Sequence, residues 1–224
     1  MELTLLWAAL TGVMMAWFGI RIWDERTPPD AFDLLIGAAI SGLAAGRLWA
    51  MVTQGVNPLT NPLDILLVRG GVDTGAATAG ALAGFLWGVR GRVGVLDAVA
   101  PAALLGLAGW HAGCLWRSAC LGTVSDFPWA WSLPGGVATR HPVETYAALG
   151  LVVAAWVVSR SSWSLLTRSG TGLALAALIR LSTEPLRPSL EGGPMALYLA
   201  GVVAGVAAIA FGAVIDRNSA HAPT

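Results

Sequence analysis

Residues 195–214 form an apolar segment of twenty consecutive residues without one charged side chain. A helix of roughly 20 apolar residues is long enough to cross the hydrocarbon core of a bilayer. A water-soluble domain has few places to bury a helix that is apolar on every face. The segment therefore predicts a transmembrane helix, and a membrane protein with it.

The composition extends this conclusion to the whole chain of 224 residues. Hydrophobic residues make up 56% and charged residues 12%, and the mean hydropathy is +0.69. Roughly a quarter of the residues in soluble domains are charged. In a membrane protein fewer are charged, because positions that face lipid must be apolar as well. The net charge is zero, so no basic field favours nucleic acid as a partner. We expect an all-α integral membrane protein.

Several more segments have the length and composition of spanning helices. We expect one membrane domain over residues 1–224, with about seven transmembrane helices around a lipid-accessible cavity. The sixth span is the weakest, because Arg168 interrupts it, and the first is a retained span rather than a signal peptide, since Glu2 replaces the usual positive charge. The predicted spans cover residues 3–22, 31–52, 72–89, 96–116, 143–158, 163–181 and 195–214.

The arginines predict the orientation of these spans. Arginines in short linkers are typical of the cytoplasmic side, and here they are Arg21, Arg26, Arg90, Arg92, Arg160, Arg168 and Arg217. The arginines of the longer loops would then face outside, and these are Arg69, Arg117, Arg140 and Arg187. This arrangement places the N-terminus outside and the C-terminus in the cytoplasm.

Small residues and cysteines add structural expectations. Gly80, Gly84 and Gly88 recur one helical turn apart on the third span, a pattern that favours close helix packing. Cys114 and Cys120 are too few for a disulfide framework. We expect neither a cofactor nor a metal.

Ionisable side chains within spans mark candidate sites, because burying them in a membrane is costly. Arg47 lies near the end of the second span and could also extend to the lipid headgroups. His111 lies within the fourth span and could instead hydrogen-bond between helices. The spacing of Arg180, Glu184 and Arg187 puts them on one helix face, which would also suit an interfacial salt-bridge patch.

The long loops with arginine and glycine all fall on the predicted outer side. Arginine forks bind phosphate in bidentate fashion, and glycine lets the backbone approach a ligand. These features favour a site for a phospholipid or a similar phosphate-bearing amphiphile. Arginine rims also occur in transporters.

An ordered series of motifs covers nearly the whole chain. Through these motifs the chain resembles the bacterial prolipoprotein diacylglyceryl transferase family. In order, the motifs are residues 33–47, Asn61-Pro62-Leu63-Asp64, Arg69-Gly70-Gly71, Asp97-Ala98-Val99-Ala100-Pro101, Gly113-Cys114, Gly122-Thr123, Ser125-Asp126-Phe127-Pro128-Trp129-Ala130, Arg140-His141-Pro142-Val143-Glu144-Thr145-Tyr146, and Arg180 with Glu184 and Arg187.

Four positions depart from the family pattern. Gly75-Ala76-Ala77 stands where the family has His-Gly-Gly, and His111 stands where it has an arginine in the fourth span. Ala119 stands where many members have an acidic residue in the following loop, and Ala147 stands where the family has a glutamate after Leu-Tyr.

The resemblance implies a seven-span enzyme of the bacterial inner membrane. Its partners would be membrane lipids, phosphatidylglycerol as diacylglyceryl donor and a prolipoprotein whose lipobox cysteine thiol accepts the group. Arg180 would bind the phosphate, and His111 or His141 would activate the thiol, since histidine exchanges protons near neutral pH; His141 could instead only orient its neighbours. Glu184 would form a structural ion pair. Further phosphate or lipid contacts are expected from Arg47, Arg69, Arg140, Arg187, Asn61, Gly113 and Tyr146.

Three functions are consistent with the sequence. The first is diacylglyceryl transfer with a rearranged centre. The second is a relative that binds phospholipid or modifies another acceptor. The third is a small membrane transporter or an assembly subunit.

Overall fold

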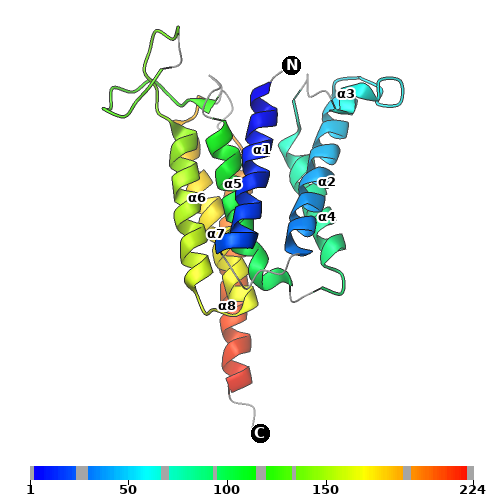
Figure 1. Cartoon of the computed structure of the whole chain (residues 1–224), viewed down its shortest axis with the longest axis vertical. Coiled ribbons are helices and arrows are strands. Elements are labelled where there is room, and N and C mark those ends of the chain that lie inside the picture. The colour runs from blue at the N-terminus through cyan, green and yellow to red at the C-terminus, as the bar shows by residue number, and fades with distance from the viewer. Residues whose placement is uncertain are drawn as a thin grey trace. The chain divides into compact units, whose positions relative to one another are not determined.

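A computed structural model describes residues 3–23, 30–66, 71–92, 95–114, 120–132, 135–188 and 193–220 (Figure 1). Within these ranges the regular structure is helical, and the predicted all-α class is confirmed for them. The helices are α1 (Leu3–Phe18) with a π-helical turn (Gly19–Trp23), α2 (Asp30–Thr53), α3 (Leu63–Leu66), α4 (Thr74–Val89), α5 (Leu96–Gly113), α6 (Val143–Arg160), α7 (Leu165–Thr183) with a 3-10 turn (Glu184–Leu186), and α8 (Met195–Ala220).

Three of the described helices are long and apolar enough to cross a membrane: Asp30–Thr53, Val143–Arg160 and Met195–Asp216. Thr74–Val89 is apolar but shorter. The outward surface carries large apolar side chains, among them Trp7, Trp156 and Phe211, each more than half exposed. Such a surface suits contact with lipid. Seven spans around a lipid-accessible cavity remain a prediction.

The chain forms two compact units, described here separately. Among the described residues, α2, α3 and α4 make up the α2/α4 unit, and α1 with α5, α6, α7 and α8 makes up the α5–α8 unit. A single membrane domain over residues 1–224 remains a prediction.

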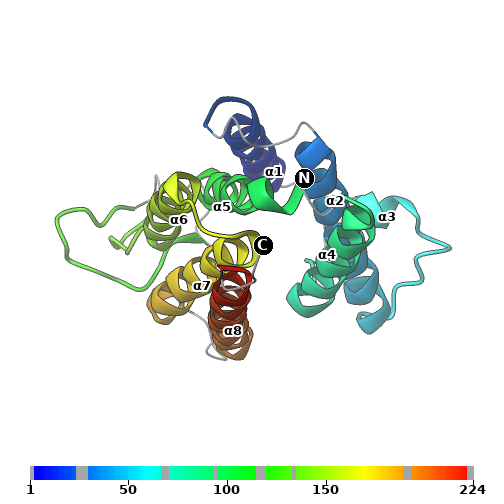
Figure 2. The same cartoon turned by 90° about the horizontal axis from the view of Figure 1, so that it is seen from below.

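Glycines bring α2 and α4 together in the first of these units (Figure 2). A Cβ atom on Gly80 would meet the Ala45 side chain and the Ser41 carbonyl, and one on Gly84 would meet the Ser41 side chain. On α2, a Cβ atom on Gly46 would meet Asp73 and Ala77 of the facing segment. The predicted packing role of the glycine ridge is confirmed.

The apolar core of the α5–α8 unit lies between α5 and α6. Leu105 and Ala108 of α5 belong to one cluster of buried side chains with Leu151 and Ala155 of α6, and all four are almost fully buried. Ile179 of α7 packs against this core. Three helices therefore contribute to one apolar core.

Two features of the α5–α8 unit were not predicted. Arg168, assigned to an interfacial linker, is instead buried, and its Nε donates a hydrogen bond to the Val158 carbonyl at 3.1 Å. The physical reason is that the carbonyls at the end of α6 need donors that the helix itself cannot supply. Cys114 and Cys120 form a disulfide, with Cα atoms 5.9 Å apart.

Candidate active site

Ionisable side chains from three helices meet in the α5–α8 unit. His111 lies in the last turn of α5, Glu144 in the first turn of α6 and Arg180 in the last turn of α7; Glu184 opens the 3-10 turn and Arg187 follows it. We call these five residues the charge cluster. Helices α5, α6 and α7 lie together in this unit (Figures 1 and 2). Hydrogen bonds and ion pairs join residues of the charge cluster that are far apart in sequence.

Glu144 lies at the centre of the charge cluster and is 3% exposed. Its Oε2 atom hydrogen-bonds His111 Nδ1 and lies 3.6 Å from Arg180 Nη1. Its Oε1 atom lies 3.6 Å from Arg187 Nε. A buried carboxylate is tolerated only when cations and donors surround it, and here a histidine and two arginines do so.

Glu184 provides the second carboxylate of the charge cluster. Its Oε2 atom accepts a hydrogen bond from Arg180 Nη2 at 3.1 Å and lies 3.5 Å from Arg187 Nη1. Each arginine therefore contacts both carboxylates. With His111 neutral, the two arginines and two carboxylates sum to zero charge.

One donor atom of Arg180 makes no hydrogen bond within the described residues. Its Nη1 atom is buried and donates no hydrogen bond to any residue that the structure describes. The Tyr198 ring of α8 lies 5.6 Å from the guanidinium carbon. Buried polar atoms normally find a partner, and an anionic oxygen is the acceptor that an arginine binds best. This atom is thus suited to bind a phosphate oxygen.

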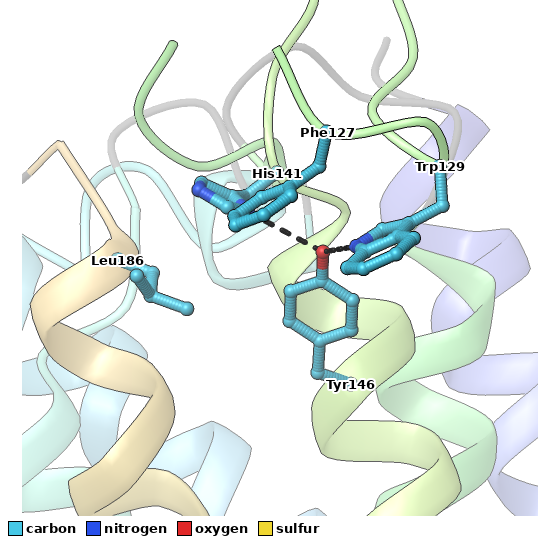
Figure 3. Close-up of a pocket in the computed structure, with 5 residues that line it drawn as sticks. All are labelled: Phe127, Trp129, His141, Tyr146 and Leu186. Atoms are coloured by element: carbon cyan, nitrogen blue, oxygen red, sulfur yellow. Dashed lines mark hydrogen bonds between the residues drawn. The ribbon is translucent and has the colours of Figure 1, made fainter. Parts of the chain in front are cut away.

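An aromatic pocket of about 430 Å³ lies beside the start of α6 (Figure 3). Phe127 and Trp129 stack with ring centres 5.0 Å apart, and Leu186 lies across from them. The Tyr146 hydroxyl accepts a hydrogen bond from Trp129 Nε1 at 2.7 Å and lies 3.3 Å from His141 Nδ1. The structure thus places His141 and Tyr146 in this pocket.

Backbone hydrogen bonds join the pocket to the end of α7. The Gly122 amide donates to the His141 carbonyl at 2.7 Å, and the Thr123 amide donates to the Leu186 carbonyl at 2.8 Å. A Cβ atom on Gly122 would meet the Leu186 carbonyl, so only glycine fits there. Arg140 donates from Nη1 to the Gly122 carbonyl at 3.1 Å and thereby stabilises the same loop.

The predicted residues of the α2/α4 unit have other surroundings. Arg47 is 4% exposed, and it donates from Nε to the Asp64 carbonyl at 2.8 Å and from Nη1 to the Gly71 carbonyl at 3.1 Å. It is therefore buried and does not extend to a surface. Asn61 is exposed and donates to the Thr60 hydroxyl at 3.0 Å. Arg69 lies outside the described residues.

Gly113 has a packing role in the structure. A Cβ atom there would meet the Thr11 hydroxyl and the backbone of Ala8, both on α1. Thr11 also donates a hydrogen bond to the Gly109 carbonyl at 2.8 Å. Close approach of α1 and α5 accounts for a glycine at this position, and a lipid contact by Gly113 stays a prediction.

Glu144 is the site residue that the sequence analysis missed. His111 was predicted as a site residue, whereas Glu144 was passed over as part of a motif. The structure brings the two side chains into direct contact. The signal that could have found Glu144 is an ionisable side chain at the start of a predicted span.

Comparison with known proteins decides the family. The family model for prolipoprotein diacylglyceryl transferase matches residues 3–215, which is almost the whole chain. The chain belongs to this family. Within this family of transferases, this member carries the His111–Glu144 pair.

Individual relatives carry the same description. The phosphatidylglycerol–prolipoprotein diacylglyceryl transferase of Methylobacillus flagellatus is 29% identical over an alignment of 185 residues, which covers 75% of this chain and 69% of the relative. The transferase of Chromohalobacter salexigens is 34% identical over an alignment of 185 residues, which covers 76% of this chain and 69% of the relative. The transferase of Pseudomonas paraeruginosa is 27% identical over an alignment of 204 residues, which covers 84% of this chain and 77% of the relative.

Proposed function

We propose that this protein transfers diacylglycerol from phosphatidylglycerol to the thiol of a lipobox cysteine in a prolipoprotein. The observation that carries the proposal is the buried Nη1 atom of Arg180, which has no hydrogen-bond acceptor among the described residues. It lies in a cluster with a second arginine and a histidine. Membership of the transferase family supplies the reaction.

The reaction needs a site that binds phosphate. A thiol sulfur displaces glycerol phosphate from a carbon of the donor lipid, and the leaving phosphate gains negative charge. Arg180 and Arg187 would bind its oxygens through N–H groups, which stabilise an anion strongly when water is excluded. We further propose phosphate or lipid contacts for Arg47, Arg69, Arg140, Asn61 and Tyr146.

The reaction also needs a base for the thiol, because the thiolate is the nucleophile. His111 is the better candidate, since it lies in the charge cluster beside Arg180 and Arg187. His141 lies in the aromatic pocket, where its Nδ1 atom faces the Tyr146 hydroxyl. We assign His141 an orienting role.

We propose that the chain spans the bacterial inner membrane seven times, with the N-terminus outside and the C-terminus in the cytoplasm. The Cys114–Cys120 disulfide supports this orientation, because disulfides persist on the oxidising outer side of the membrane. It lies at the end of α5 that also carries His111. The charge cluster would then lie near the outer face of the membrane.

Transfer of labelled diacylglycerol by the purified protein tests the proposed function. Nanodiscs would contain phosphatidylglycerol labelled in the diacylglycerol, with a lipobox peptide as acceptor. We expect a labelled thioether and release of glycerol phosphate. Binding of phosphatidylglycerol with no transfer at any pH would overturn the proposal and favour a lipid-binding relative.

A further inference from the structure

We propose that Glu144 is a positioning residue that holds His111 with its proton on Nδ1, so that the Nε2 lone pair takes the proton of the acceptor thiol. This inference rests on the proposed function for its chemistry. The hydrogen bond between the two residues is an observation on its own.

The surroundings of Glu144 determine which atom carries the proton. Its carboxylate lies 3.6 Å from both Arg180 and Arg187, and two guanidinium groups favour its ionised form. An ionised carboxylate only accepts hydrogen bonds. His111 Nδ1 must therefore be the donor, and in a neutral imidazole Nε2 is then the acceptor.

The geometry fixes the ring as well as its proton. Glu144 is buried at the start of α6 and contacts groups of α5 and of the segment that follows α7. The α5–α6 core keeps the two helices in place. His111 thus has one fixed hydrogen bond, which limits rotation of its ring.

In the proposed reaction the charge cluster gains positive charge as the phosphate gains negative charge. Before transfer, Arg180, Arg187, Glu144 and Glu184 sum to zero and His111 is neutral. In the proposed step the thiol S–H proton moves to Nε2, the sulfur–carbon bond forms, and the carbon–oxygen bond to phosphate breaks with its electron pair on oxygen. The cluster gains one positive charge as the phosphate goes from a monoanion to a dianion.

Glu144→Gln gives a directional test. In the variant the amide oxygen keeps the Oε1 position facing Arg187, which places the amide NH₂ at the Oε2 position facing His111. Nδ1 must then accept, and the proton moves to Nε2. We expect nitrogen-15 NMR of labelled, folded protein to show the Nδ1–H tautomer in the wild type and the Nε2–H tautomer in Glu144→Gln. The chain has three histidines, and a His111→Asn spectrum assigns the signal.

Activity gives the second readout. Glu144→Gln should lower kcat for transfer by roughly 10²–10⁴-fold, the usual contribution of a positioned base, with less effect on KM for phosphatidylglycerol. Glu144→Asp should restore the Nδ1–H tautomer and part of kcat. An unchanged tautomer in Glu144→Gln, or a kcat that follows only the amount of folded protein, overturns the inference. A wild type that shows the Nδ1–H tautomer without any transfer would refute the proposed function instead.

Discussion

Arg180 and Glu184 close the end of α7 with a hydrogen bond of 3.1 Å between Nη2 and Oε2. They are four positions apart in the sequence, so the pair follows from helix geometry alone. The bond uses one side of the guanidinium, and Nη1 on the other side lies 3.6 Å from Glu144 Oε2 without a hydrogen bond within the described part of the chain. The ion pair expected between Arg180 and Glu184 therefore also sets the orientation of Nη1.

Replacing Arg180 should abolish transfer. Arg180→Ala removes the phosphate donors, and Arg180→Lys keeps the charge but cannot form two parallel hydrogen bonds. We expect both variants to lose at least roughly 10²-fold in kcat/KM, the scale seen for single donors to a developing anion. Arg160→Ala is the control, because Arg160 is exposed at the end of α6. Wild-type transfer by Arg180→Lys at equal membrane abundance would contradict the assignment.

His111 and His141 should differ in their effect. His111→Arg supplies a permanent positive charge but no proton acceptor, so we expect transfer to be lost while phosphatidylglycerol binding persists. His141→Gln should retain most transfer, because the pocket hydrogen bond does not involve the charge cluster. Transfer assays on both variants, with protein amounts matched by immunoblot, check the prediction. Full activity of His111→Arg would show that charge alone is needed.

The packing of α2 on α4 should be sensitive to a single methyl group. Gly80→Ala places a Cβ atom against Ala45 and the Ser41 carbonyl, and we expect it to destabilise by about 1–3 kcal/mol, as overpacking does. Gly37→Ala is the matched control, since its Cβ atom would meet nothing within 4 Å. Thermal unfolding in detergent should show a lower midpoint for Gly80→Ala alone. Equal midpoints would argue against this interface.

Breaking the Cys114–Cys120 disulfide should lower stability. The bond closes a loop with a sequence separation of 6, and the chain-entropy model gives about 2 kcal/mol for a loop this short. The double variant Cys114→Ser/Cys120→Ser should therefore unfold at a lower temperature. Reductant should produce the same shift in the wild type and no shift in the double variant. A wild type insensitive to reductant would contradict the prediction.

Labelling from outside the cell tests the orientation. Val137→Cys places a thiol at a fully exposed position of the loop before α6, and we expect a membrane-impermeant maleimide to label it in intact spheroplasts. Arg160→Cys, at the opposite end of α6, should react only after permeabilisation. The reverse pattern would place the charge cluster on the cytoplasmic side.

Helices and their packing were the predictable part of this chain. Long apolar segments mark helices whatever their neighbours are, so residues 31–52 and 195–214 were recognised from composition alone. The glycine ridge was recognised because a period of one turn defines a helix face. Arg168 was assigned wrongly, because sequence position does not reveal that the carbonyls ending α6 lie within its reach.

The charge cluster was predictable only in part. Arg180, Glu184 and Arg187 were expected together because spacing along one helix determines their proximity. The His111–Glu144 contact spans 33 positions and depends on how α5 packs on α6, which no local pattern specifies. The role of the Glu144 charge likewise depends on the two arginines that the fold places beside it.

The pairing of two arginines with two carboxylates in the charge cluster has a consequence for the proposed enzyme. Two arginines alone would repel each other in a medium of low dielectric constant, and they would need a bound anion beside them. Glu144 and Glu184 replace that anion from within the chain. On the proposed function, product can therefore depart before the next donor lipid binds, and the charge cluster needs no structural lipid between turnovers.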